Sequence, residues 1–186
     1  MIDDIKKAFE VLKNGGVILY PTDTIWGIGC DATNDTAVQR IYQIKKRADS
    51  KSMLVLMENP ALLDRYVVEV PEIAWDLVEV ATTPLTVIYP GAKNLAKNLI
   101  AEDGSIGIRF TKEAFTSHLL QRFRRPIVST SANVSGEKSP AVFDEISEEI
   151  KSQVDYVVEY RQNDNSPAQP SSIIKLGLGG QIEIIR

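Results

Sequence analysis

The chain has 186 residues, a length typical of one folded domain, and its 44% hydrophobic and 25% charged residues are the balance of a globular protein. We therefore expect a single domain over residues 1–186. The net charge of −4 excludes a general basic surface that would hold nucleic acid non-specifically. Cys30 is the only cysteine and His118 the only histidine, which excludes a disulfide framework and a Cys/His metal cluster, so we expect no protein-held metal.

The N-terminal residues Met1 to Asp4 are acidic where a secretory signal is basic, and no apolar run approaches the length of a membrane span. We expect a cytoplasmic protein without a membrane contact.

Apolar residues at helical spacing predict a first helix around residues 5–12, ended by Asn14-Gly15-Gly16. The apolar run 17–20, closed by Pro21, is typical of a buried strand. Asn34-Asp35 predicts the cap of a second helix, which ends in Lys45-Lys46-Arg47.

The rest of the chain alternates between predicted strands and helices. Asn59-Pro60 predicts a helix with proline at its first position. Further strands are predicted at 53–57, 85–89, 106–110, 127–129, 156–160, 172–176 and 182–185, and further helices around 72–81, 112–123 and 142–152. This alternation, with continuous apolar strands, predicts an α/β sheet covered by helices. Gly177–Gly180 predicts a hairpin between the last two strands, so the sheet is expected to be mixed, and 161–170 is expected to be a surface loop.

Four polar segments interrupt this apolar pattern beside predicted strands, where open α/β sheets build their sites. In the first, residues 21–27, two threonine hydroxyls and a carboxylate follow a proline that fixes the backbone. These groups are suited to binding a ligand. A turn in which Thr22 and Asp23 satisfy the local backbone is the alternative.

The second segment places Lys45, Lys46, Arg47 and Lys51 within seven residues, with Asp49 as the single acid between them. These cations complement the C-terminus of a helix, and they equally suit a polyphosphate, with lysine as a point charge and arginine as a fork.

In the third segment, 105–109, an arginine at position 109 stands within an apolar strand. A buried arginine requires an anionic partner, either a structural acid or the carboxylate of a substrate. The fourth segment, 129–136, is rich in hydroxyl and amide groups. It can present hydrogen-bond donors to phosphate, carboxylate or adenine, or it can serve as a capping loop.

Several familiar motifs are absent or incomplete. The chain lacks the G-x-x-x-x-G-K-[ST] motif, so it is not a P-loop enzyme. Residues 27–32 fit G-x-G-x-x-A, but they are separated from the preceding strand by a polar loop, which argues against a dinucleotide fold. His118 lies in a helical pattern, and we expect a surface or packing residue rather than a catalytic base.

Together the four segments resemble the YrdC/TsaC family of threonylcarbamoyl-AMP synthases, in the short form with a single YrdC-like domain. The resemblance runs from about Gly15 to Arg186. Its motifs are Pro21-Thr22-Asp23-Thr24-x-Trp26-Gly27, Lys45-x-Arg47, Pro84-Leu85-Thr86, Ile106-x-Ile108-Arg109 and Ser131-x-Asn133-x-Ser135-Gly136.

This resemblance implies a twisted, mixed, open α/β sheet with a positively lined cavity on its concave side. It also implies that L-threonine, bicarbonate or CO₂, and ATP react to give threonylcarbamoyl-AMP and pyrophosphate, for the modification of tRNA to N6-threonylcarbamoyladenosine. Carried over by position, Lys45 and Arg47 would be catalytic. Thr24, Arg109, Ser131 and Ser172 would hold threonine, and Lys45, Arg47, Lys51, Ser105, Asn133 and Arg186 would face ATP.

The implied partners are the three substrates and, transiently, tRNA or the tRNA threonylcarbamoyl-transferase machinery. Mg²⁺ is expected to be bound mainly by phosphate and water.

The chain departs from the family pattern at Trp26, Ala48, Ser52, Met53, Thr82-Thr83 and Ala141. These departures leave room for a paralogous, YciO-like protein, whereas the presence of Lys45, Arg47, Ser131 and Asn133 together favours the synthase. An RNA-binding module helped by Arg122, Arg124 and Arg125, and a sensor that binds ligand without chemistry, are further alternatives.

Overall fold

The computed structural model describes residues 1–47, 53–166 and 168–186. Lys51 and the departures Ala48 and Ser52 therefore lie outside the described residues.

A nine-stranded sheet forms the centre of the described chain, in the order β7-β1-β2-β6-β3-β5-β4-β8-β9. Its pairings are mixed: β3–β5, β4–β8 and β1–β7 are parallel and the others antiparallel. The strands are β1 (Ile18–Tyr20), β2 (Gly27–Gly29), β3 (Leu54–Met57), β4 (Leu85–Tyr89), β5 (Ile106–Phe110), β6 (Ile127–Ser131), β7 (Tyr156–Val157), β8 (Ser172–Leu176) and β9 (Ile182–Ile184). The prediction of a mixed open α/β sheet is confirmed.

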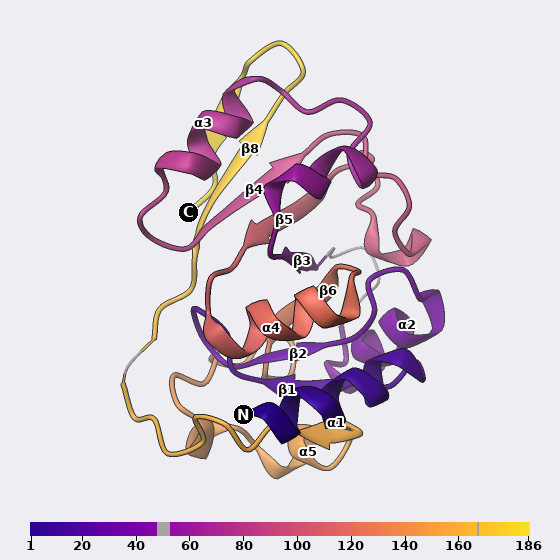
Figure 1. Cartoon of the computed structure of the whole chain (residues 1–186), viewed down its shortest axis with the longest axis vertical. Coiled ribbons are helices and arrows are strands. Elements are labelled where there is room, and N and C mark those ends of the chain that lie inside the picture. Colours follow the sequence, from indigo (N-terminus) through magenta and orange to yellow (C-terminus); the bar gives the residue numbers. More distant parts are fainter. Residues whose placement is uncertain (48–52, 167) are drawn as a thin grey trace.

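Helices connect and cover these strands. They are α1 (Ile2–Lys13), α2 (Asp35–Ile44), α3 (Ile73–Val80), α4 (Ala114–Phe123) and α5 (Glu148–Lys151), with 3₁₀ helices η1 (Pro60–Arg65), η2 (Lys97–Leu99) and η3 (Phe143–Glu145). Figure 1 shows α1 and α4 side by side in the half of the molecule that holds the N-terminus, while α3 lies beside β4 and β8 in the other half. Within the described residues, none of the helices is both long and apolar enough to cross a bilayer.

Local sequence signals explain where these elements begin and end. Asn34 caps α2 as predicted, because its side chain accepts a hydrogen bond from Ala37 N. Asn59 and Pro60 begin η1, which is a 3₁₀ helix rather than the expected α-helix. The helix predicted over 142–152 is instead divided into η3 and α5, and the strand predicted over 156–160 is shortened to β7, since Glu159 N donates to the carboxylate of Asp4.

The strand β2 was not predicted, because its two glycines hide the apolar pattern of a strand. Gly29 is required by close packing: a Cβ there would lie 2.4 Å from Val128 O and 2.7 Å from Tyr20 Cε1. The G-x-G segment is thus an antiparallel strand between β1 and β6, not the turn of a dinucleotide-binding unit.

The two faces of the sheet are covered differently. One face packs against α2 through the larger core cluster, which includes Ile28, Val55, Val87, Ile108 and Val128. On the other face, α1 and α4 cover Leu56 and Ile127. Residues paired across neighbouring strands point to the same face, and here Leu56 pairs with Arg109 and Leu54 with Ser129. Beyond the two helices, this second face therefore carries polar side chains.

Candidate functional site

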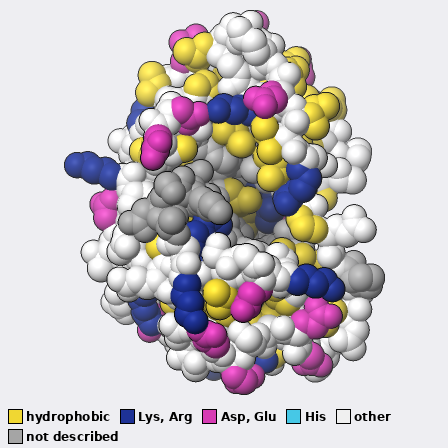
Figure 2. All heavy atoms as spheres, turned by 180° about the vertical axis from the view of Figure 1, so that it is seen from behind, with side chains coloured by type: hydrophobic (Ala, Val, Ile, Leu, Met, Phe, Trp, Pro, Cys, Tyr) yellow, Lys and Arg dark blue, Asp and Glu magenta, His cyan; other side chains and the backbone are white. Residues whose placement is uncertain are grey.

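A cavity of about 280 Å³ lies where these polar side chains meet. The face of the molecule shown in Figure 2 is hollowed near its centre, and Lys and Arg side chains gather around the hollow. Each of the four polar segments contributes to the lining of this cavity, although the third segment contributes only Arg109. The lining residues are Thr24, Ile25, Trp26, Gly27, Arg47, Met53, Leu54, Arg109, Ser129, Thr130, Ser131, Ser139, Pro170, Ser171, Ile173 and Arg186.

Three arginines line this cavity, of which Arg109 is the most buried. Its side chain is 4% exposed and its Nη2 lies 3.0 Å from Oδ1 of Asp23. Nε of Arg109 is also buried, and it has no hydrogen-bond partner among the described residues. The β5 strand fixes this position, since Arg109 pairs with Leu56 of β3 and Thr86 of β4 in the register. Because Arg109 also lines the cavity, its charged guanidinium is suited to binding an anion there.

Arg47 and Arg186 reach the cavity from distant parts of the chain. Arg47 follows the C-terminus of α2, where burial lowers the pKa of its guanidinium. Arg186 is the last residue, and its Nε donates to Ser171 O at 3.1 Å. The structure thus brings together Arg47 and Arg109, which the family resemblance assigned to ATP and to threonine, although Arg109 also has the structural acid Asp23 as a partner.

Lys45 is close to the cavity but does not line it. Its side chain is buried, and its Nζ donates to the carbonyl oxygens of Ser131 at 2.5 Å and Asn133 at 2.7 Å. Burial, together with the nearby Arg47, lowers the pKa of Lys45 to about 8. Its ammonium therefore supports the loop that follows β6.

The same loop is held by Asn133, whose side chain also lies outside the cavity lining. Asn133 Nδ2 donates to Val134 O at 3.0 Å and Glu137 O at 2.8 Å. Ser131, at the end of β6, does line the cavity. The fourth segment is therefore a loop with its own internal support that presents Ser131 to the cavity.

Thr24 reaches the cavity from the loop between β1 and β2. Its backbone N donates to Thr22 Oγ1 at 3.0 Å, and Thr22 Oγ1 donates to Ile25 O at 2.7 Å. The local turn, which is the alternative to ligand binding for this segment, is thus present, and it holds Thr24 at the cavity wall.

Ser105 lies in an adjoining cavity of about 520 Å³ on the same face of the sheet. The two cavities share Met53, Leu54 and Ile173 in their linings. Ser105 Oγ donates to Asp103 Oδ1, and the hydrogen bonds from Lys175 and Ser105 lower the pKa of Asp103 to about 2. Of the predicted ATP residues, Arg47 and Arg186 therefore line the smaller cavity and Ser105 the adjoining one, whereas Lys45 and Asn133 line neither.

Ser172 does not line either cavity. It pairs with Leu85 in the register and is exposed on the opposite face of the sheet from Ile173. Its neighbour Ser171 is buried, lines the smaller cavity and shares a 2.8 Å hydrogen bond with Thr86. The side-chain period of two along a strand separates these neighbours, and a motif match alone could not decide which serine faces inward.

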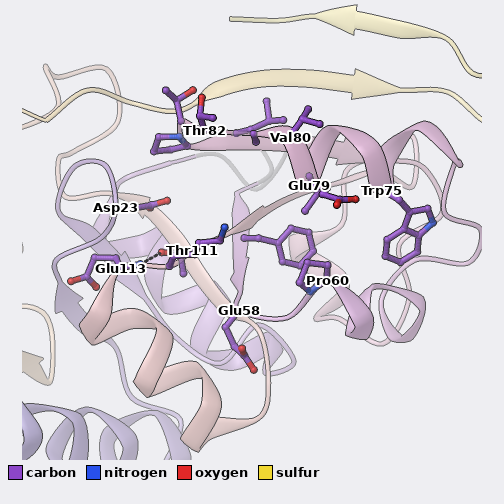
Figure 3. A pocket seen from close by; sticks show the side chains of 16 residues that line it. Asp23, Glu58, Pro60, Trp75, Glu79, Val80, Thr82, Thr111 and Glu113 are labelled. Atoms are coloured by element: carbon purple, nitrogen blue, oxygen red, sulfur yellow. Dashed lines mark hydrogen bonds between the residues drawn. The ribbon is translucent and has the colours of Figure 1, made fainter.

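Four of the departures that the structure describes line cavities: Trp26, Met53, Thr82 and Thr83. Met53 lines both cavities, and Trp26 lines the smaller one and packs on Phe143 with ring centroids 4.8 Å apart. Thr82 and Thr83 line a third cavity of about 850 Å³ beside α3. Figure 3 shows this third cavity, with Asp23, Thr111 and Glu113 near one end and Trp75 and Pro60 near the other.

His118 is exposed on α4, with Nδ1 2.6 Å from Ala114 O, as expected for a surface residue. Among the described residues, no three His, Cys, Asp or Glu side chains gather closely enough to hold a metal ion.

These features define the class of the protein: an open mixed α/β sheet with an arginine-lined cavity on one face. A family model described as "Telomere recombination" and labelled Sua5/YciO/YrdC matches residues 10–186. The chain belongs to this family, and the resemblance to YrdC/TsaC proteins is confirmed.

Relatives with curated names support the same placement. The chain is 34% identical over 181 residues to the threonylcarbamoyl-AMP synthase of Pseudoalteromonas translucida, covering 96% of this chain and 95% of that protein. It is 30% identical over 162 residues to the threonylcarbamoyl-AMP synthase of Vibrio cholerae, covering 86% of each.

Solved structures share the fold. Escherichia coli YciO superimposes with a TM-score of 0.83 at 25% identity, over 98% of this chain and 87% of that one. A variant of Sua5 from P. abyssi superimposes with a TM-score of 0.86 at 23% identity, over 98% of this chain but 55% of that longer one.

Proposed function

We propose that this chain is an L-threonylcarbamoyladenylate synthase, which converts L-threonine, bicarbonate or CO₂, and ATP into threonylcarbamoyl-AMP and pyrophosphate. Its curated relatives carry this name at 30% to 34% identity over most of their length. The observation that carries the proposal is the position of Arg109, buried in a strand with an unpartnered Nε among the described residues, in a cavity that Arg47 and Arg186 also line.

In this proposal the smaller cavity holds threonine. Arg109 binds the carboxylate through its guanidinium, and the hydroxyls of Thr24, Ser131 and Ser171 recognise the polar groups of the amino acid. Ser171 takes the role that the resemblance gave to Ser172, because it is the serine that faces the cavity.

ATP extends from this cavity into the adjoining one. Arg47 and Arg186 neutralise phosphate oxygens, and Ser105 lies in the second hollow. Lys45 and Asn133 act through the loop that they support. Lys51 remains assigned to ATP by resemblance. A Mg²⁺ ion that accompanies ATP would be bound mainly by phosphate and water.

The chemistry requires alignment more than a covalent group from the protein. The amine of threonine adds to CO₂ and releases a proton, which forms a carbamate. A carbamate oxygen then attacks the α-phosphorus of ATP, the bond from that phosphorus to the bridging oxygen breaks, and pyrophosphate leaves with the electron pair. The described lining of the smaller cavity contains three arginines and no Asp or Glu side chain, so it favours a neutral amine and an anionic carbamate over an ammonium.

The product would serve the modification of tRNA in the cytoplasm. A transient contact with tRNA or with the transferase that uses the product belongs to this proposal.

The test is incubation of the purified protein with ATP, bicarbonate and each amino acid in turn, followed by measurement of pyrophosphate and of the adenylate by mass. Threonine-dependent release of pyrophosphate with a matching adenylate is expected. Threonine binding without pyrophosphate would indicate a sensor or a YciO-like paralogue instead. RNA affinity that falls steeply with salt, without consumption of ATP, would indicate an RNA-binding module.

A further inference from the structure

Asp23 is the acidic partner of Arg109, and it approaches the arginine from a different part of the fold. Asp23 lies in the loop between β1 and β2, whereas Arg109 lies in β5. Their side chains are 16% and 4% exposed, and Asp23 Oδ1 lies 3.0 Å from Arg109 Nη2. Burial raises the pKa of the Asp23 carboxyl and the neighbouring guanidinium of Arg109 opposes that rise, so the attraction between the two groups is what favours the charged carboxylate here.

The loop that carries Asp23 is fixed on both sides. Pro21 O accepts a hydrogen bond from Thr116 of α4, and Thr22 O accepts one from Arg161. On the other side, Thr24 is bonded to Thr22. These hydrogen bonds hold the loop, and with it the carboxylate of Asp23, at a set place beside Arg109.

Asp23 does not line the cavity that Arg109 lines. It lines the 850 Å³ cavity beside α3, and Figure 3 shows its side chain at one end of that cavity. The ion pair thus forms part of the wall between two hollows, with the acid on one side and the guanidinium on the other. An acid in this place can orient the arginine without meeting a ligand bound beyond it.

The geometry of the guanidinium completes the argument. Nη2 faces Asp23, while Nε has no hydrogen-bond partner among the described residues. Since the guanidinium is planar, fixing one nitrogen by an ion pair restricts the direction of the others.

We propose that Asp23 is a positioning residue of the amino-acid subsite, which holds the guanidinium of Arg109 in the orientation in which it meets the carboxylate of the amino acid. This inference rests on the proposed function. It assigns to the third residue of the first polar segment a role in affinity for the amino acid and none in the binding of ATP.

The first test is the Asp23→Asn variant, which keeps the shape of the side chain and removes its charge. Threonine affinity, measured by calorimetry on the full chain, is expected to fall about tenfold to a hundredfold, the range of a hydrogen bond to a charged group. The Kd for ATP is expected to remain unchanged, and kcat at saturating threonine to change much less than KM for threonine. Equal losses for threonine and ATP, or no loss for threonine, would overturn the proposal.

A matched control exists in Asp155, which pairs with Arg40 outside the cavities described above. Asp155→Asn removes the same charge from an Asp–Arg pair, and it is expected to leave both affinities unchanged. If this variant also loses threonine affinity, the loss seen in Asp23→Asn results from net charge or stability rather than from positioning, and the proposal is overturned.

A double-mutant cycle tests whether Asp23 acts through Arg109. In an Arg109→Lys background, Asp23→Asn is expected to have little further effect on threonine affinity, because the planar fork is gone. Additive effects would contradict the proposal. If Asp23→Asn does not fold, Asp23→Glu keeps the charge and displaces the carboxylate by one methylene group. A fall in threonine affinity is expected in that variant too, and unchanged affinity overturns the positioning role.

The two levels of proposal fail separately. If the wild-type protein binds no threonine and releases no pyrophosphate, the proposed function is wrong. If the wild type turns over threonine and Asp23→Asn does so with an unchanged KM for threonine, the function stands and the role of Asp23 is wrong.

Discussion

Lys45 and Ser131 are 86 residues apart in the chain, yet Nζ of Lys45 lies 2.5 Å from the carbonyl oxygen of Ser131. The same ammonium donates to Asn133 O, and the backbone O of Lys45 accepts a hydrogen bond from Ser135 N at 2.8 Å. The end of α2 and the loop after β6 are thus joined by both the side chain and the main chain of a single residue. Several testable consequences arise from this joint and from the cavity beside it.

Lys45→Met should loosen the loop after β6. The methionine keeps the length of the side chain but leaves the carbonyls of Ser131 and Asn133 without their donor. The free energy of unfolding is expected to fall by about 2 to 3 kcal/mol, and the amides of residues 131–136 to exchange faster with solvent. Urea unfolding and hydrogen exchange measure the two effects. Stability loss without faster exchange in the loop would contradict a specific role for this joint.

The pH dependence of stability should reveal the same lysine. Its pKa is lowered from the usual 10.5 to about 8, chiefly by burial, so the folded protein holds this proton less tightly than the unfolded chain does. The contribution of Lys45 to the free energy of unfolding therefore rises with pH between about 8 and 10.5, by up to about 3 kcal/mol. The difference in stability between wild type and Lys45→Met across this range isolates the contribution. A difference that stays constant with pH would show that the pKa is not lowered.

Arg47→Ala should lose ATP-dependent turnover by orders of magnitude while the protein stays folded, because Arg47 lines the cavity and is assigned to phosphate. Release of pyrophosphate measures the loss and circular dichroism the folding. Lys46 is the matched control, since its exposed side chain pairs with Glu149. Lys46 has a φ of 49°, so Lys46→Asn is the suitable substitution, and it should retain turnover. Equal activity of both variants would contradict the phosphate role of Arg47.

The two neighbouring serines at the start of β8, Ser171 and Ser172, should behave differently. Ser171→Ala removes a hydroxyl from the cavity wall, and the KM for threonine is expected to rise about fivefold to tenfold. Ser172→Ala changes an exposed side chain on the other face and should leave the KM for threonine unchanged. Steady-state kinetics of both variants show whether threonine contacts Ser171, as the register of β8 indicates, or Ser172, as the family resemblance indicates. The reverse pattern would show that Ser172 faces the ligand.

Gly29→Ala should destabilise the fold by about 3 kcal/mol or more, because the added Cβ would overlap Val128 O and the ring of Tyr20. Gly104→Ala is the comparison. Gly104 has a φ of +77° but nothing within 4 Å of an added Cβ, so its cost is that of backbone strain alone, about 1 kcal/mol. Thermal unfolding ranks the two variants. A smaller loss at Gly29 than at Gly104 would contradict the close approach of β2 and β6.

The sequence by itself determined the sheet and most of its strands. Strands 85–89, 106–110 and 172–176 are found at the predicted bounds, because short apolar runs between turn residues are a local signal. The Asn34 cap was equally local. The elements that the sequence did not predict correctly depend on contacts with distant residues. The strand β2 depends on its close packing against the backbone of β6, and the end of β7 on the carboxylate of Asp4.

The tertiary structure decided which polar residues share a cavity. Sequence singled out Arg47 and Arg109 by residue type, but only the sheet register and the end of α2 place both in one hollow. The tertiary structure likewise places Ser171 and Ser172 on opposite faces of the sheet, and it places the ammonium of Lys45 against the loop after β6 rather than in the cavity lining. These outcomes depend on pairings between residues tens of positions apart, and because a strand alternates its faces, an error of one residue reverses what a side chain can reach.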